Sequence, residues 1–185
     1  MEEKLFTISI LTEDKPGLLN KITIIFNRRK INIRSLNVSS SEIQGVSRYT
    51  LVVLLNEVDV EKIVKQIRRV VDVLGSFYYE EDEIYYREIA LYKLSLEVYN
   101  SNKELEQLIR NHGAKVIATE GDQIVLEKTG YKQETHELYD ALLPYDLLEF
   151  VRSGRVALSK SKRRTEAFIH ELENSTSNTL SIKEF

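Results

Sequence analysis

The spacing of apolar residues in the first 83 residues switches between that of a strand and that of a helix, and this order constrains the fold most. Phe6, Ile8 and Ile10 alternate with polar residues, as in a strand with one buried face. From Leu18 to Phe26 the apolar residues recur at helical spacing. Two strands, a second helix and a fourth strand follow. The order predicts an α+β fold of the ferredoxin-like βαββαβ type, an antiparallel sheet with both helices on one face.

The boundaries of these elements follow from local signals. Residues 49–55 are a continuous apolar run and predict the third strand. Asp59 precedes an apolar stripe of helical spacing, so we expect it to be the N-cap of the second helix. A charge run at residues 79–83 then breaks the apolar pattern, which is typical of a solvated connector.

The same order of elements restarts after the charge run. We predict a strand over residues 89–98, a helix whose capping box is Ser101 with Glu104, and a stop for that helix at Gly113. Strands at 114–119 and 123–128, a helix at 132–143 and a strand at 146–151 complete a second βαββαβ unit. The predicted organisation is therefore a tandem: a first unit at 1–79, a charged linker at 80–87, a second unit at 88–159, and a basic and polar tail at 160–185 with a short amphipathic helix near Phe168.

The connection between the first strand and the first helix is the best candidate for a ligand site. Asp14 can cap the helix, Pro16 suits its first turn, and Gly17 lets another group approach the backbone. The N–H groups at a helix start favour a carboxylate or a phosphate. Asn32, at the start of the second strand, carries both a donor and an acceptor. The alternative is that Asp-x-Pro-Gly serves here as good turn and capping chemistry alone.

The sequence D-K-P-G-L-L, followed about fifteen residues later by I-N-I, resembles the ACT domain, a regulatory module that binds amino acids. The resemblance extends to V-S-R-Y-T-L, V-D-V-L, Y-R-E-I-A-L-Y-K-L and E-F-V-R-S-G-R-V-A-L-S, which are similar to successive blocks of the small, regulatory subunit of acetolactate synthase (acetohydroxyacid synthase). It covers, with gaps, residues 5 to 159. Residues from about Arg164 lie beyond it.

The resemblance implies a binding site shared by two chains. ACT domains of this kind form homodimers edge to edge, with the ligand between the turn of one copy and the second strand of the other. Gly17 and Leu18 would then donate backbone N–H groups to the ligand carboxylate. Asn32 and Ile33 would close the site, and Asp14 would receive the ammonium group. Valine is the amino acid that this family typically senses.

The resemblance further implies a function in isoleucine and valine biosynthesis. The chain would activate the large catalytic subunit of acetolactate synthase and confer feedback inhibition by valine. Thiamine diphosphate, Mg²⁺ and FAD would be bound by the large subunit, with no cofactor in this chain. Three positions depart from common family residues: Asp14 for Asn, Leu18 for a smaller residue, and Arg34 for Glu. These departures predict a weaker response to valine, or a preference for another amino acid.

The residues themselves give no sign of a catalytic or metal site. Cysteine is absent, and His112, His136 and His170 each stand without a second ligand at metal-binding spacing. No nucleophile-elbow, zinc-protease or phosphate-loop motif occurs. We therefore expect no enzyme activity from this chain alone.

Composition limits the classes of partner. The net charge is −3, so bulk electrostatics favour neither nucleic acid nor an anionic membrane. The sequence has no apolar run of transmembrane length and begins with acidic residues, unlike a signal peptide, so we expect a cytoplasmic protein. Two alternatives stay open: a free-standing tandem-ACT amino-acid sensor that controls transcription, and an RNA-binding ferredoxin-like module that uses the basic cluster at 160–164.

Overall fold

The computed structural model describes residues 2–161, which divide into two compact units. The first unit combines the described parts of Met1–Tyr85 and Ala157–Phe185, and the second is Tyr86–Val156. No helix among the described residues is long and apolar enough to cross a membrane. The amphipathic helix predicted near residue 168, and the tail beyond Ser161, lie outside the described residues.

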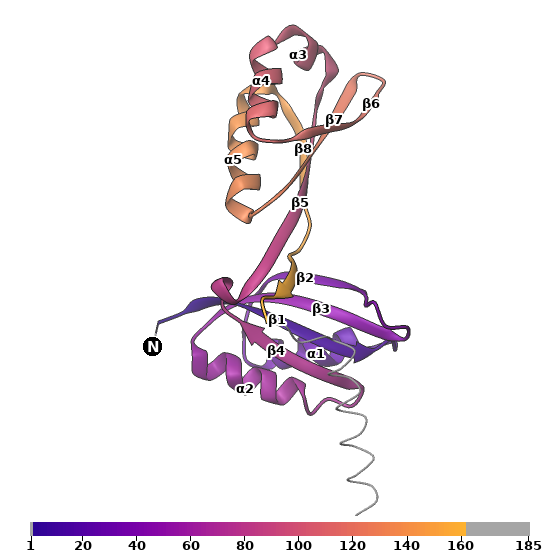
Figure 1. Cartoon of the computed structure of the whole chain (residues 1–185), viewed down its shortest axis with the longest axis vertical. Helices are drawn as coiled ribbons and strands as arrows, with labels where there is room; N and C mark the ends of the chain where they lie inside the picture. The colour runs from indigo at the N-terminus through magenta and orange to yellow at the C-terminus, as the bar shows by residue number, and fades with distance from the viewer. Residues whose placement is uncertain (1, 162–185) are drawn as a thin grey trace, which may run out of the picture. The chain divides into compact units, whose positions relative to one another are not determined.

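The first unit has the predicted βαββαβ order. Its elements are β1 (Lys4–Glu13), α1 (Leu18–Arg28), β2 (Ile33–Ser40), β3 (Val46–Leu55), α2 (Glu57–Ile67) and β4 (Val73–Tyr79). The strands form one antiparallel sheet in the order β2-β3-β1-β4. Both helices cover the same face of this sheet (Figure 1). The ferredoxin-like prediction for this part of the chain is therefore confirmed.

The core of the first unit lies between the sheet and its two helices. Alternate residues of β1 point into it, and Phe6, Ile8 and Ile10 are at most 1% exposed. The helices contribute one apolar stripe each: Ile22, Ile25 and Phe26 from α1, and Val60, Ile63, Val64 and Ile67 from α2. This packing buries the residues that carry the strand and helix periodicities, and it positions the β1–α1 turn at the end of the central strand.

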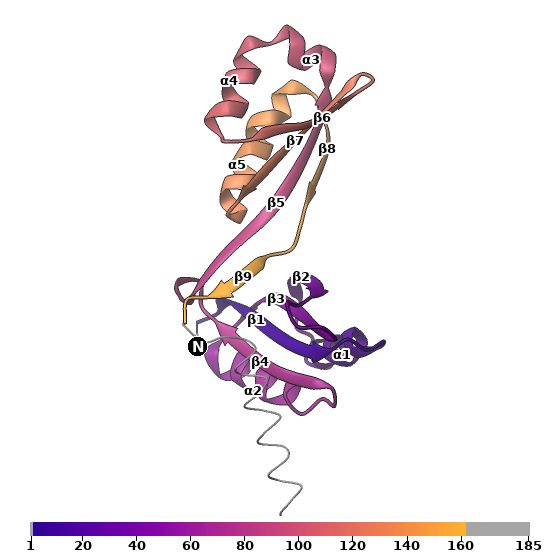
Figure 2. The same ribbon diagram turned by 45° about the vertical axis from the view of Figure 1, so that its right-hand side comes forward.

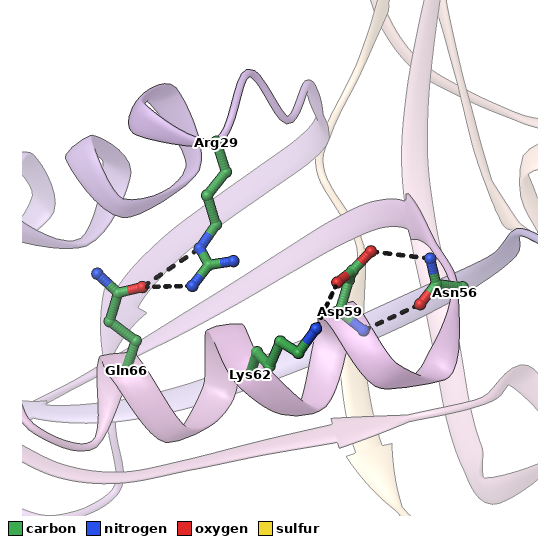
Figure 3. A network of polar contacts seen from close by, with 5 residues as sticks. All are labelled: Arg29, Asn56, Asp59, Lys62 and Gln66. Atoms are coloured by element: carbon green, nitrogen blue, oxygen red, sulfur yellow. Dashed lines mark hydrogen bonds and ion pairs between the residues drawn. The ribbon is translucent and has the colours of Figure 1, made fainter.

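The N-cap of helix α2 lies three residues before the predicted cap, Asp59. Asn56 is the N-cap, and its Oδ1 accepts a hydrogen bond from the Asp59 N–H at 3.0 Å. The Asp59 carboxylate lies in the first turn and accepts from Asn56 Nδ2 at 2.8 Å (Figure 3). That hydrogen bond, with further help from Lys62, lowers the pKa of the Asp59 carboxyl. The prediction of Asp59 as N-cap is wrong, because Asn56 is also a strong cap and leaves Asp59 to complement the helix dipole.

A second contact in Figure 3 joins the two helices of the first unit. Arg29, the residue that follows α1, donates from Nε and Nη2 to Gln66 Oε1 of α2, at 3.3 and 3.2 Å. The contact lies on the exposed side of both helices, so it ties their surfaces together above the apolar core.

The second unit repeats the order with one helix divided in two. It contains β5 (Ile84–Ser95), α3 (Leu96–Ser101), α4 (Lys103–Asn111), β6 (Lys115–Glu120), β7 (Gln123–Gly130), α5 (Lys132–Leu142) and β8 (Leu147–Arg152). Its sheet order, β6-β7-β5-β8, is that of the first unit strand for strand, and β9 (Val156–Ser159) pairs with β5 off this path. Helices α4 and α5 cover one face (Figure 2). The tandem prediction is confirmed.

Local details of the second unit differ from the predictions. Strand β5 begins at Ile84, inside the segment 80–87 expected to be a linker, after a short 3₁₀ turn at Glu81–Glu83. Ser101 ends α3, and its hydroxyl donates to the Glu97 carbonyl at 2.8 Å, so the predicted capping box with Glu104 does not form. The chain turns into α3 at Leu96, whose N–H donates to the Asp122 carbonyl, so the strand predicted over 89–98 ends three residues earlier, at Ser95.

Tyr92 lies at the centre of the second unit. It is fully buried, its ring lies 5.2 Å from that of Phe150, and its hydroxyl donates to the Thr135 carbonyl of α5 at 2.6 Å. Burial raises the pKa of the Tyr92 hydroxyl to about 12. Tyr92 fills the core of its own unit, because the alternation of side chains along β5 turns it toward the helices.

Replacing Tyr92 with Phe should lower the free energy of unfolding by about 1 kcal/mol, because the buried hydroxyl loses its bond to the Thr135 carbonyl while the ring stays in place. Urea denaturation followed by circular dichroism measures this. Tyr85→Phe is the matched control, since Tyr85 is 64% exposed and should show no change. Equal stability of both variants would mean that the Tyr92 hydroxyl contributes nothing net.

Candidate ligand-binding site

The β1–α1 turn brings an open helix start to the end of the central strand. Gly17 precedes α1 with φ 83° and ψ −7°, and no side-chain hydrogen bond caps the helix. A Cβ on Gly17 would meet no atom within 4 Å, so its left-handed backbone, and not lack of space, favours glycine there. The N–H groups of the first turn, beginning at Leu18, have no partner within the helix. An open helix start of this kind can receive a carboxylate.

Leu18 contributes to this turn through its backbone. Its side chain is 1% exposed, so it belongs to the interior of the first unit. Exposed Pro16 and Gly17 precede it along the chain.

Asp14 does not cap α1 as predicted. Its N–H donates to the Gly45 carbonyl at 2.8 Å, and its carboxylate accepts from the Ser47 hydroxyl at 3.0 Å. These two bonds anchor the turn to the connection between β2 and β3. Asp14 therefore makes these long-range hydrogen bonds instead of capping α1. A carboxylate has several acceptor sites, so Asp14 can also receive an ammonium group.

An ion-pair cluster beside the turn was not predicted. Lys15 Nζ lies 2.5 Å from Glu13 Oε2 and 2.9 Å from Asp72 Oδ1, and Lys21 of α1 lies 3.5 Å from Asp72 Oδ2. The hydrogen bonds to Glu13 and Asp72 raise the pKa of Lys15, and the hydrogen bond from Lys15 lowers the pKa of Asp72. Asp72 ends the turn before β4, so the pairing of β1 with β4 would have been the signal for this contact.

Asn32 and Ile33 lie at the other end of the sheet. Ile33 pairs with Val53, which pairs with Phe6 near the start of β1, whereas the turn follows the end of β1 at Glu13. Six or seven strand residues separate the two ends, or roughly 20 Å. One copy of the chain therefore brings together Asp14, Gly17 and Leu18, and does not bring Asn32 and Ile33 to them. Asn32 is exposed just before the edge strand β2.

Among residues 2–161, no three side chains of the His, Cys, Asp or Glu type gather closely enough to hold a metal ion. His112 Nδ1 lies 2.9 Å from the Leu108 carbonyl, and His136 Nε2 lies 3.9 Å from Asp140 Oδ2. His170 lies outside the described residues. The two described histidines thus contact residues one helical turn away. The groups that the β1–α1 turn offers to a ligand are backbone N–H donors and the Asp14 carboxylate.

Two family models match successive parts of the chain. The profile described as "AHAS small subunit-like ACT domain" matches residues 8–75, and the one described as "Small subunit of acetolactate synthase" matches residues 87–161.

Named relatives match both units together. The chain is 34% identical to the acetolactate synthase small subunit of Mycolicibacterium smegmatis over 157 residues, which are 85% of this chain and 92% of that protein. It is 33% identical to the Bacillus subtilis small subunit over 158 residues, 85% of this chain and 91% of the other. The crystal structure of the Thermotoga maritima small subunit superposes with a TM-score of 0.77 at 27% identity, covering 86% of this chain and 99% of that one.

Two units of one topology, an open helix start in the first, and similarity over most of both lengths thus agree. The chain belongs to the family of acetolactate synthase small subunits.

Proposed function

We propose that this chain activates the large catalytic subunit of acetolactate synthase and makes it responsive to an amino acid, with valine as the expected ligand. Family membership supports the regulatory role. The observation that carries the ligand assignment is the uncapped start of α1 at Gly17, beside the Asp14 carboxylate. Backbone N–H groups would receive the carboxylate of the amino acid and Asp14 its ammonium.

The second half of the proposed site comes from another copy. Strand β2 is an edge of the first sheet, with exposed residues at its far end. Antiparallel pairing of two β2 edges about a two-fold axis reverses one sheet relative to the other. The start of β2 in one copy then lies at the same end as the β1–α1 turn of the other. Asn32 and Ile33 would close the site of the partner, with Ile33 facing the apolar side chain of valine.

Coupling to catalysis follows from the two-chain site. A ligand that bridges two copies favours one arrangement of the dimer, and such coupling is worth about 1–3 kcal/mol. Thiamine diphosphate, Mg²⁺ and FAD would be held by the large subunit, whose activity this arrangement changes. We expect the protein to work in the cytoplasm, where the pathway operates.

The direct test is acetolactate formation by the large subunit of the same organism, with and without this protein and with valine titrated in. Addition of the chain should stimulate the rate, and valine should reverse the stimulation. Stimulation without valine inhibition would keep the partnership and remove valine as ligand. Absence of both stimulation and co-purification would refute the proposal.

Asn32→Ala and Gly17→Ala should each raise the valine concentration for half-inhibition by about tenfold or more, while stimulation of the large subunit persists. The first removes the amide that closes the site. The second strains a left-handed position by roughly 1–2 kcal/mol and displaces the N–H donors. Asn100→Ala, on the exposed surface of the second unit, is the control and should respond as wild type.

Mixing the two variants tests whether the site is shared. In a mixed dimer, one site carries both substitutions and the other carries neither, so part of the valine response should return. If Gly17 and Asn32 acted within one chain, every site in the mixture would keep one defect, and no response would return. Valine binding by calorimetry on refolded mixtures measures the difference without the large subunit.

A further inference from the structure

Strand β6 (Lys115–Glu120) is an outer edge of the second sheet (Figures 1 and 2). Its backbone pairs with β7 on one side, and within residues 2–161 no strand pairs on the other. All six of its side chains are exposed, including Val116 at 45% and Ile117 at 50%. A strand of this kind offers a row of unsatisfied N–H and C=O groups.

The composition of β6 favours pairing with another strand. Val116, Ile117 and Thr119 are β-branched, the strand has no proline, and its charges stand only at its two ends, Lys115 and Glu120. Charged side chains and proline along an edge strand are two of the devices that prevent association. Residues 116–119 of β6 include neither.

A bulge places the two end charges on one face. The register with β7 shifts between Val116 and Ala118, which leaves Ile117 as an extra residue. In a regular strand the first and sixth residues point to opposite faces. With one residue inserted between them, Lys115 and Glu120 point to the same face.

The pairing with β7 identifies that face. Val116 and Thr119 lie opposite Leu126 and Ile124, two buried residues of the core under the helices. These two β6 residues therefore share the helix-covered side. The charged ends lie on the open side of the sheet.

We propose that β6 pairs antiparallel with β6 of a second copy, about a two-fold axis perpendicular to the sheet. Lys115 of each copy then lies opposite Glu120 of the other, and Val116 opposite Thr119. A two-fold axis perpendicular to the sheet leaves the open faces of both copies on the same side of the joined sheet. Both Lys–Glu pairs therefore form on the open face. Without the bulge, the opposing charges would point to different faces.

The arrangement of charge identifies the partner as a second copy. One positive and one negative end make the strand complementary to itself when reversed, whereas parallel pairing would place like charges together. The β6 interface does not depend on a ligand in the first unit. Pairing through β6 would therefore be a second contact between copies, in addition to the proposed pairing through β2.

Charge reversal tests the pairing in the full-length chain. Lys115→Glu and Glu120→Lys each turn two ion pairs into two like-charge contacts, and each should weaken self-association about tenfold or more in sedimentation equilibrium. The double variant restores opposite charges and should return to within about twofold of wild type. Lys132→Glu, an exposed reversal on α5, is the control for net charge and should change nothing. Single reversals that leave association unchanged would overturn the proposal.

A cysteine placed near the axis tests the geometry independently. The chain has no cysteine, so Ala118→Cys supplies a single thiol. In this register Ala118 lies opposite Ile117 of the other copy, so the two copies of Ala118 are diagonal neighbours on the open face, with Cα atoms roughly 6 Å apart, within disulfide range. Mild oxidation should give a covalent dimer. The added substitution Lys115→Glu should lower the yield of this dimer. Leu148→Cys, exposed on β8 at the opposite edge, is the control.

The outcomes separate this interface from the role of the first unit. A cross-link at position 118 in a protein without valine response supports the β6 pairing and removes the valine proposal alone. Equal cross-linking at 118 and 148, or none at 118, overturns the β6 pairing. Loss of large-subunit binding in the β6 variants without a 118 cross-link would assign this edge to the large subunit instead, and would also overturn it.

Discussion

The pairing of β1 with both of its neighbours is the constraint on which the first unit depends. β1 pairs with β3 along its whole length, from Lys4 opposite Leu55 to Glu13 opposite Val46, and with β4 on its other side. This central position buries Phe6 and its alternate neighbours and delivers the chain to the helix start at one end of the sheet. The same register holds the start of β2 at the other end. A site that uses both ends must therefore be built by two chains.

The element order could be predicted because it follows from periodicity, which burial enforces along whole strands and helices. Helix starts could not, because several residues near each start were chemically able to cap. Asp14 is anchored by Ser47 and Gly45, and Asp59 leaves the cap to Asn56. In each case a contact with another segment, or a second residue of equal capping strength, decided between local alternatives.

The candidate site was predictable to the extent that residue type alone fixes geometry. Gly17 occupies a left-handed position, and that preference belongs to glycine wherever it stands. The contact of Lys15 with Asp72 joins residues 57 apart, so no local pattern contains it. The bulge at Ile117 was equally invisible, because nothing in K-V-I-A-T-E marks one residue as extra until β7 sets the register. How Asn32 and Ile33 take part stays a prediction.

The path of the chain through the two units has a consequence for synthesis. The first unit takes up Met1–Tyr85 and then residues from Ala157 onward, so the second unit is inserted within it. The Lys160 N–H donates to the Glu83 carbonyl at 2.9 Å, which joins the returning segment to the point where the chain had left. On the ribosome, the six elements from β1 to β4 emerge early. The returning segment, which begins at Ala157, emerges only after all of β5 to β8. A nascent chain can therefore bury the core of the first unit before the second is made, and the contact of Lys160 with Glu83 forms last.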